Sequence, residues 1–183
     1  MPLTSPVDRE RIHTRSYDFG GYLRADGLWD IEGHMTDTKS YAVDNRDRGR
    51  IEPGEPIHDM WLRLTIDEDL LIHDIEAVTE AGPFTLCPAI TPNFQRMVGQ
   101  RIGAGWRRAI HKELGGIQGC THLVEMLGAM GTVAYQTLFS ARAKKAKANG
   151  DARTRSPLID SCHAFASDGP VVKRQWPEFY TGK

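Results

Sequence analysis

The spacing of apolar residues changes once along this chain, and that change restricts the fold more than any other feature. Up to residue 79 the apolar residues mostly alternate with polar ones, as in β-strands. The strand-like segments span residues 17–22, 28–35, 57–66 and 71–79. The last two are joined by the acidic turn Asp67-Glu68-Asp69, which predicts a hairpin. Residues 46–56 are charged and contain glycine and proline, which predicts a loop.

The second half of the chain predicts two helices. We expect the first to span Pro92–Leu114, with Thr91 as its N-cap, Pro92 at its first position and Gly115-Gly116 as its end. The second begins near Cys120 and ends in the lysine- and alanine-rich residues 141–148. Its apolar stripe follows helical spacing and consists of Leu123, Met126, Leu127, Met130, Val133, Ala134 and Leu138.

Strands followed by helices predict an α+β domain, with helices packed on one face of a largely antiparallel sheet. The chain has 183 residues, which suits one domain of residues 1–148. We expect residues 149–157 to be a linker. The rest of the tail, up to residue 183, has enough apolar residues to pack back on the domain.

Charge and composition exclude several classes of protein. The net charge is −1, which predicts neither nucleic acid nor an anionic membrane as partner. No apolar run approaches the roughly 18 residues of a membrane-spanning helix, and no signal peptide is recognisable at the N-terminus. Three cysteines do not suit a secreted disulfide framework, so we expect a cytoplasmic protein.

His58 is the first candidate for chemistry. Alternation places it at the end of the strand face that carries Met60, Leu62, Leu64 and Ile66, against which the helices should pack. A neutral imidazole in that position is a good metal ligand. The alternative is a histidine at the edge of the core that hydrogen-bonds a backbone carbonyl.

Cys120 and His122 stand where the second helix begins. A helix N-terminus favours a negatively charged sulfur, which is the form that binds metal. Cys87 precedes the first helix, in a loop between prolines that can lie near the same end of the sheet. His58, Cys87, Cys120 and His122 together have the ligand types of a mononuclear zinc or iron site. The alternative is that these are buried cysteines and structural histidines.

Three further residues are candidates for proton transfer. Asp37 and Lys39 follow the strand of residues 28–35, and Asp59 follows His58. A lysine near a metal can act as an acid or a base, although such a pair is also common at a solvated strand end. Whether Cys162 or His163 of the tail joins the site is left open.

Several separate motifs resemble a bacterial family catalogued as domain of unknown function 2889. They are Asp26-Gly27-Leu28-Trp29-Asp30-Ile31-Glu32-Gly33, Asp37-x-Lys39, Ile57-His58-Asp59-Met60, Cys87, and Gly119-Cys120-Thr121-His122-Leu123. The resemblance runs in order from about Arg11 to Asp160-Ser161-Cys162-His163. The family name implies no activity.

The strand that begins at His58 is also similar to that of IscU/NifU-type iron–sulfur scaffold proteins. His58 stands where the scaffold has an aspartate, and Cys87 and Cys120-x-His122 resemble the other ligand positions. The resemblance implies an IscU/NifU-like fold. The first scaffold cysteine is absent, because Pro56-Ile57 precedes His58.

These observations predict a metal-dependent catabolic enzyme that acts on a small substrate with a hydroxyl or carbonyl group. The preferred reaction is that of a lyase, an aldol-type C–C cleavage, and the alternatives are a hydrolase, an iron–sulfur or metal carrier, and a structural zinc domain. Trp29, Trp61, Trp106 and Phe84 are candidate walls for an aromatic substrate. Assembly into a homo-oligomer is left open.

Overall fold

The computed structural model describes residues 3–148 and 155–183 and confirms an α+β fold. Its main sheet has four antiparallel strands in the order β1-β2-β5-β6. Their bounds are β1 His13–Leu23, β2 Trp29–Lys39, β5 Pro56–Ile66 and β6 Ile72–Ala81. A short hairpin of β3, Val43–Asn45, and β4, Gly49–Ile51, connects β2 to β5.

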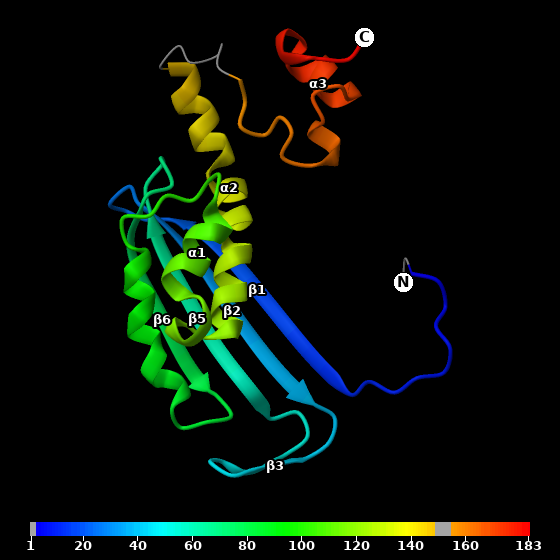
Figure 1. Ribbon diagram of the computed structural model, residues 1–183, viewed down its shortest axis with the longest axis vertical. Coiled ribbons are helices and arrows are strands. Elements are labelled where there is room, and N and C mark those ends of the chain that lie inside the picture. Colours follow the sequence, from blue (N-terminus) through cyan, green and yellow to red (C-terminus); the bar gives the residue numbers. More distant parts are fainter. Residues whose placement is uncertain (1–2, 149–154) are drawn as a thin grey trace. The chain divides into compact units, whose positions relative to one another are not determined.

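Helices cover one face of this sheet (Figure 1). They are α1, Trp106–Leu114, and α2, Thr121–Ala148, with the 3-10 helix η1, Cys87–Met97, beside β6. The short 3-10 helix η2, Gly116–Gln118, precedes α2. The predicted faces are correct: the core contains Met60, Leu62, Leu64 and Ile66 of β5 and Leu123, Met126, Leu127, Met130, Ala134 and Leu138 of α2.

The first two strands are longer than the sequence pattern predicted. β1 and β2 pair along their whole length, from His13 opposite Lys39 to Leu23 opposite Trp29. The extended β1 provides hydrogen-bond partners for the backbone N–H and C=O groups of β2 over that length. The alternation of apolar residues alone did not predict this pairing. The consequence for function is that His13, Asp37 and Lys39 lie within the sheet. The predicted loop of residues 46–56 also contains β4.

The prediction of one helix over Pro92–Leu114 is wrong. Pro92 lies inside η1, and Thr91 does not cap it but donates its hydroxyl to the carbonyl of Pro88. Gly99 and Gly105 have φ of 81° and 84°, a left-handed conformation that an α-helix cannot include. Gly99 N–H donates to Ile72 O (2.8 Å) and Ile72 N–H to Gln100 O (3.0 Å), so the chain between η1 and α1 pairs with the start of β6.

The C-terminal end of α1 and the start of α2 agree with the prediction. α1 ends at Leu114, where Gly115 N–H donates to the carbonyl of His111. α2 begins directly after Cys120, whose carbonyl accepts from Val124 N–H. Within the described residues, no helix has the length and apolar character to cross a membrane.

The chain divides into two compact units, one ending at Arg142 and the other beginning at Ala143. The second unit contains η4, His163–Phe165, α3, Pro170–Gln175, and η5, Pro177–Phe179. Val172 is buried, and the rings of Phe165 and Trp176 meet edge to face at 5.9 Å. Residues 149–154 of the predicted linker lie outside the described residues. The packing of the tail on the domain stays a prediction.

Candidate metal centre

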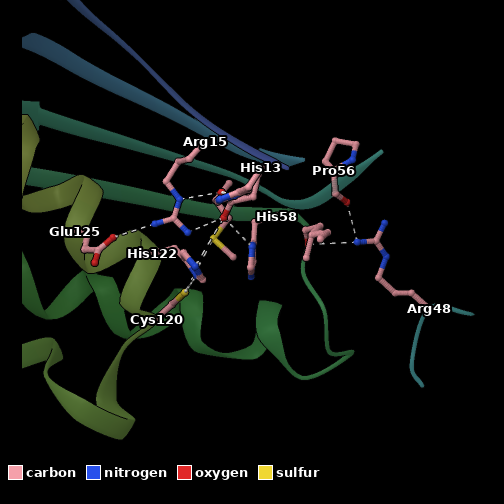
Figure 2. A network of polar contacts seen from close by, with 11 residues as sticks. His13, Arg15, Arg48, Pro56, His58, Cys120, His122 and Glu125 are labelled. Atoms are coloured by element: carbon pink, nitrogen blue, oxygen red, sulfur yellow. Dashed lines mark hydrogen bonds and ion pairs between the residues drawn. The ribbon is translucent and has the colours of Figure 1, made fainter. Parts of the chain in front are cut away.

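Three strands and one helix bring a cluster of polar side chains to one end of the sheet (Figure 2). Asp37 lies near the end of β2, directly opposite His58 on β5, and Arg15 faces Asp37 from β1. Cys120 and His122 come from the start of α2. The β3–β4 hairpin holds the start of β5, because Arg48 Nη1 donates to the carbonyls of Pro56 (2.9 Å) and Ile57 (3.3 Å).

Asp37 is the centre of this cluster and is only 3% exposed. Its Oδ1 accepts from His13 Nε2 (2.7 Å) and Arg15 Nε (2.8 Å), and its Oδ2 accepts from Arg15 Nη2 (2.7 Å) and His58 Nδ1 (3.0 Å). Burial raises the pKa of Asp37, but the hydrogen bonds from Arg15 and His13 and the charge of Arg15 outweigh it. The net effect holds the pKa well below its usual range, so Asp37 is ionised.

The ionised Asp37 fixes the tautomer of His58. A carboxylate can only accept a hydrogen bond, so Nδ1 of His58 carries the proton. Burial lowers the pKa of His58, and the neighbouring charge of His122 lowers it further, which favours a neutral ring. A neutral ring protonated on Nδ1 has a free lone pair on Nε2, ready to bind a metal.

His122 lies beside His58, with ring centroids 3.9 Å apart and planes tilted by 41°. Its Nε2 is 3.9 Å from Asp37 Oδ2, and its Nδ1 is 3.9 Å from Cys120 Sγ. Burial lowers the pKa of His122, and the nearby Arg15 adds to that effect. The two imidazoles are therefore neutral near pH 7, the form in which histidine binds metals.

Asp37, His58 and His122 can together hold a metal, because one ligand atom of each lies within 4.8 Å of the others. The carboxylate of Asp37, however, already accepts four hydrogen bonds, which is about its full capacity. A metal on Asp37 would have to displace Arg15, His13 or His58. We therefore interpret Asp37 as the carboxylate that orients a ligand, and Cys120, whose Sγ is 3.9 Å from His122 Nδ1, as a candidate to coordinate in its place.

The structure brings three of the four predicted metal ligands together and places the fourth elsewhere. His58, Cys120 and His122 belong to the cluster. Cys87 lies at the start of η1, beside Gly82, where a Cβ on Gly82 would stand 3.1 Å from its sulfur. Among the described residues, Cys87 is not part of the group of possible metal ligands that lie within 4.8 Å of one another.

The three predicted proton-transfer residues occupy different places. Asp37 is in the cluster, and Lys39 is two residues further along β2, opposite His13. Within the described part of the chain, the Lys39 ammonium group makes no hydrogen bond or ion pair. Asp59 lies on the opposite face of the sheet, where it pairs with His34 (2.8 Å), whose ring stacks on Trp61 at 3.7 Å.

The candidate aromatic residues do not gather at this cluster. Trp29 is at the other end of β2, opposite Ile66, and Trp61 is on the far face of the sheet. Trp106 packs between α1 and α2, where Nε1 donates to Leu127 O (3.3 Å). Phe84 is exposed in the loop before η1. Cys162 and His163 belong to the second unit.

The sequence analysis missed His13, Arg15 and Met60 as parts of the cluster. His13 and Arg15 share the alternation of Tyr17 and Phe19, so a longer first strand would have placed them on the same face. Met60 was assigned to the core, which is correct, since it is 1% exposed. Its Sδ is nevertheless 4.0 Å from Cys120 Sγ, and the thiol donates to it.

Comparison with known proteins identifies one family. The model of a family described as "Protein of unknown function (DUF2889)" matches residues 13–136, which span β1 to most of α2. No curated protein and no solved structure matches the chain. The likeness to IscU/NifU proteins therefore stays a prediction.

Proposed function

The chain belongs to the DUF2889 family, whose description names no activity, and from the site itself we propose that it is a metal-dependent enzyme. Its centre binds one zinc or iron ion through His58, Cys120 and His122. The observation that carries this proposal is the hydrogen bond of 3.0 Å from His58 Nδ1 to the buried Asp37 carboxylate. Metal-binding histidines almost always donate their second N–H to such a partner.

The donor set favours catalysis over a purely structural role. Structural zinc sites are closed by four protein ligands, whereas catalytic sites combine three with an open position. The cluster has two imidazoles and one thiol, and Cys87 lies outside it. Metal in such a site supplies a Lewis acid that polarises a carbonyl or hydroxyl oxygen.

The protein groups around the centre have separate tasks in this proposal. Asp37 and Arg15 hold His58 in one tautomer and orientation, through hydrogen bonds of 2.7–3.0 Å. Lys39, near the end of β2, is the first candidate to move a proton to or from the substrate. Asp59 is separated from the centre by the sheet, which makes it the weaker candidate.

We propose a lyase as the reaction class, cleaving a C–C bond of a small hydroxylated or carbonyl compound in an aldol-type step, with a hydrolase as the alternative. Polarisation of an oxygen beside a proton-transfer group serves both reactions. An iron–sulfur carrier is less well supported, because only one cysteine of the described residues, Cys120, lies in the cluster. We place this enzyme in the cytoplasm, with a small molecule rather than a macromolecule as its partner.

The test compares the purified chain with two histidine variants. Zinc- or iron-loaded protein is incubated with a panel of small β-hydroxy carbonyl compounds and, separately, a panel of esters, and released aldehyde or acid is measured. His58→Ala should lose both metal and turnover. His34→Ala, on the far face of the sheet, should keep both. Turnover by metal-free protein, or equal turnover of His58→Ala and the wild type, would contradict the proposal.

A further inference from the structure

A thioether lies against the candidate metal centre. Met60 Sδ is 4.0 Å from Cys120 Sγ. Cys120 Sγ is also 3.9 Å from His122 Nδ1 (Figure 2). Met60 follows His58 by two residues on β5 and projects from the same face of the sheet. It is 1% exposed, so the sulfur is held in place by the surrounding core.

The separations between these atoms match those of ligands on a single ion. Two donors with bonds of about 2.3 Å lie about 4.0 Å apart when they make a trigonal angle, and slightly less when one donor is nitrogen. The observed sulfur–sulfur and sulfur–nitrogen distances are 4.0 Å and 3.9 Å. Cys120 Sγ thus stands at the separation of a shared ion from both Met60 Sδ and His122 Nδ1, and an ion bound to this sulfur is within reach of either neighbour.

The chemistry of the donors indicates which ion this is. Zinc in proteins takes thiolate, imidazole and carboxylate ligands. Thiolate together with thioether selects the soft ion Cu(I). We propose that Cys120, Met60 and His122 form a trigonal Cu(I) site that overlaps the zinc or iron site.

This inference rests on the proposed function, because both donor sets use Cys120 and His122. The sets differ in one side chain: His58 belongs to the zinc or iron site, and Met60 belongs to the Cu(I) site. Because both arrangements draw on Cys120 and His122, Cu(I) competes with zinc or iron for these two ligands, displaces the catalytic metal and inhibits the enzyme.

The experiment measures the affinities for Cu(I) and for zinc by competition with coloured chelators, under anaerobic conditions. It uses the full chain with Cys87 and Cys162 replaced by serine, so that Cys120 is the only thiol. Met60→Leu should weaken Cu(I) binding by roughly 10–100-fold or more, because even the loss of a hydrogen-bond partner of a ligand weakens metal binding by that factor. The same variant should leave zinc binding unchanged. His58→Ala should weaken zinc binding and keep Cu(I) binding.

Met130→Leu is the matched control, because Met130 is equally buried but lies further along α2. It should bind both ions as the parent does. Equal Cu(I) affinity of Met60→Leu and the parent, or a parent that takes no Cu(I) from the chelator, would overturn the inference. A parent that binds Cu(I) but neither zinc nor iron would overturn the proposed function and leave the Cu(I) site standing.

Discussion

At the scale of single residues, the unusual feature is the buried carboxylate of Asp37, which accepts four hydrogen bonds. Asp37 on β2 ties the two neighbouring strands together, because Arg15 and His13 of β1 and His58 of β5 all donate to its two oxygens. A buried carboxylate held by a guanidinium costs desolvation energy that packing could avoid. Its value lies in the orientation that it imposes on the ring of His58.

The pH dependence of stability tests this carboxylate. The pKa of Asp37 is lower in the folded chain than in the unfolded chain, so unfolding in acid takes up a proton. Its stabilising effect is complete above about pH 5, begins to fall near the ordinary aspartate pKa of about 3.9, and is fully lost only when the pH falls through the much lower pKa of the folded state. Asp37→Asn should lower the free energy of unfolding of the metal-free protein by about 1.5–3 kcal/mol at pH 7.

Urea unfolding at neutral pH and at about pH 3.5 checks this, since the difference between wild type and variant should shrink in acid. Asp18→Asn, which replaces an exposed carboxylate on the other face of β1, should change stability little at either pH. A wild-type advantage over Asp37→Asn that grows in acid would refute the ionised state of Asp37.

Lys39 provides a kinetic prediction. As the proposed proton-transfer group it should be dispensable for folding, because its ammonium group pairs with no described side chain. Lys39→Met should keep metal content and thermal stability and reduce turnover by roughly 10²-fold or more. Turnover equal to the wild type would remove Lys39 from the mechanism.

At the scale of elements, α2 connects the core to the site, because Cys120 directly precedes it, His122 lies in its first turn and its middle packs on the sheet. Leu127 is completely buried there. Leu127→Ala should reduce the free energy of unfolding by about 2–5 kcal/mol, as expected for a cavity in a packed core. Gln136→Ala, at an exposed position of the same helix, should change it by less than about 0.5 kcal/mol in denaturant titrations. Similar values for the two variants would show that this stripe is not core.

The crossing of α1 and α2 depends on one glycine. A Cβ on Gly131 would lie 2.7 Å from the Trp106 indole, whereas a Cβ on Gly128 would meet nothing within 4 Å. Gly131→Ala should therefore destabilise by about 1–2 kcal/mol, overpacking outweighing the gain in helix propensity. Gly128→Ala should stabilise by about 0.5–1 kcal/mol. Thermal unfolding of the two variants tests this prediction. A higher melting temperature for Gly131→Ala than for the wild type would mean that α1 and α2 do not cross this closely.

At the scale of the whole molecule, the parts of the fold that depend on local pattern were predictable and the parts that depend on pairing were not. His58 could be assigned to the core face of its strand, and Cys120 to a helix start, from their immediate neighbours. Arg15 could not be linked to Asp37, because only the register between β1 and β2 brings them together.

The helix prediction failed for the same physical reason. Apolar spacing over Pro92–Leu114 is helical, but the backbone near Gly99 pairs with Ile72, a residue far away in the sequence. Cys87 is the corresponding failure in the site. The sequence placed it in a loop that could reach the end of the sheet with His58, but the loop turns so that Cys87 lies against Gly82 instead. Long-range pairing decides the first case and the path of a loop decides the second, and the spacing of apolar residues carries no information about either.

The most direct test of the metal centre is X-ray absorption spectroscopy at the zinc edge of the zinc-loaded protein. The account predicts one sulfur scatterer at about 2.3 Å and nitrogen scatterers at about 2.0–2.1 Å. The sulfur should disappear in Cys120→Ser and persist in Cys87→Ser. A zinc ion surrounded only by nitrogen and oxygen in the wild type, or a sulfur that is lost in Cys87→Ser and kept in Cys120→Ser, would contradict it.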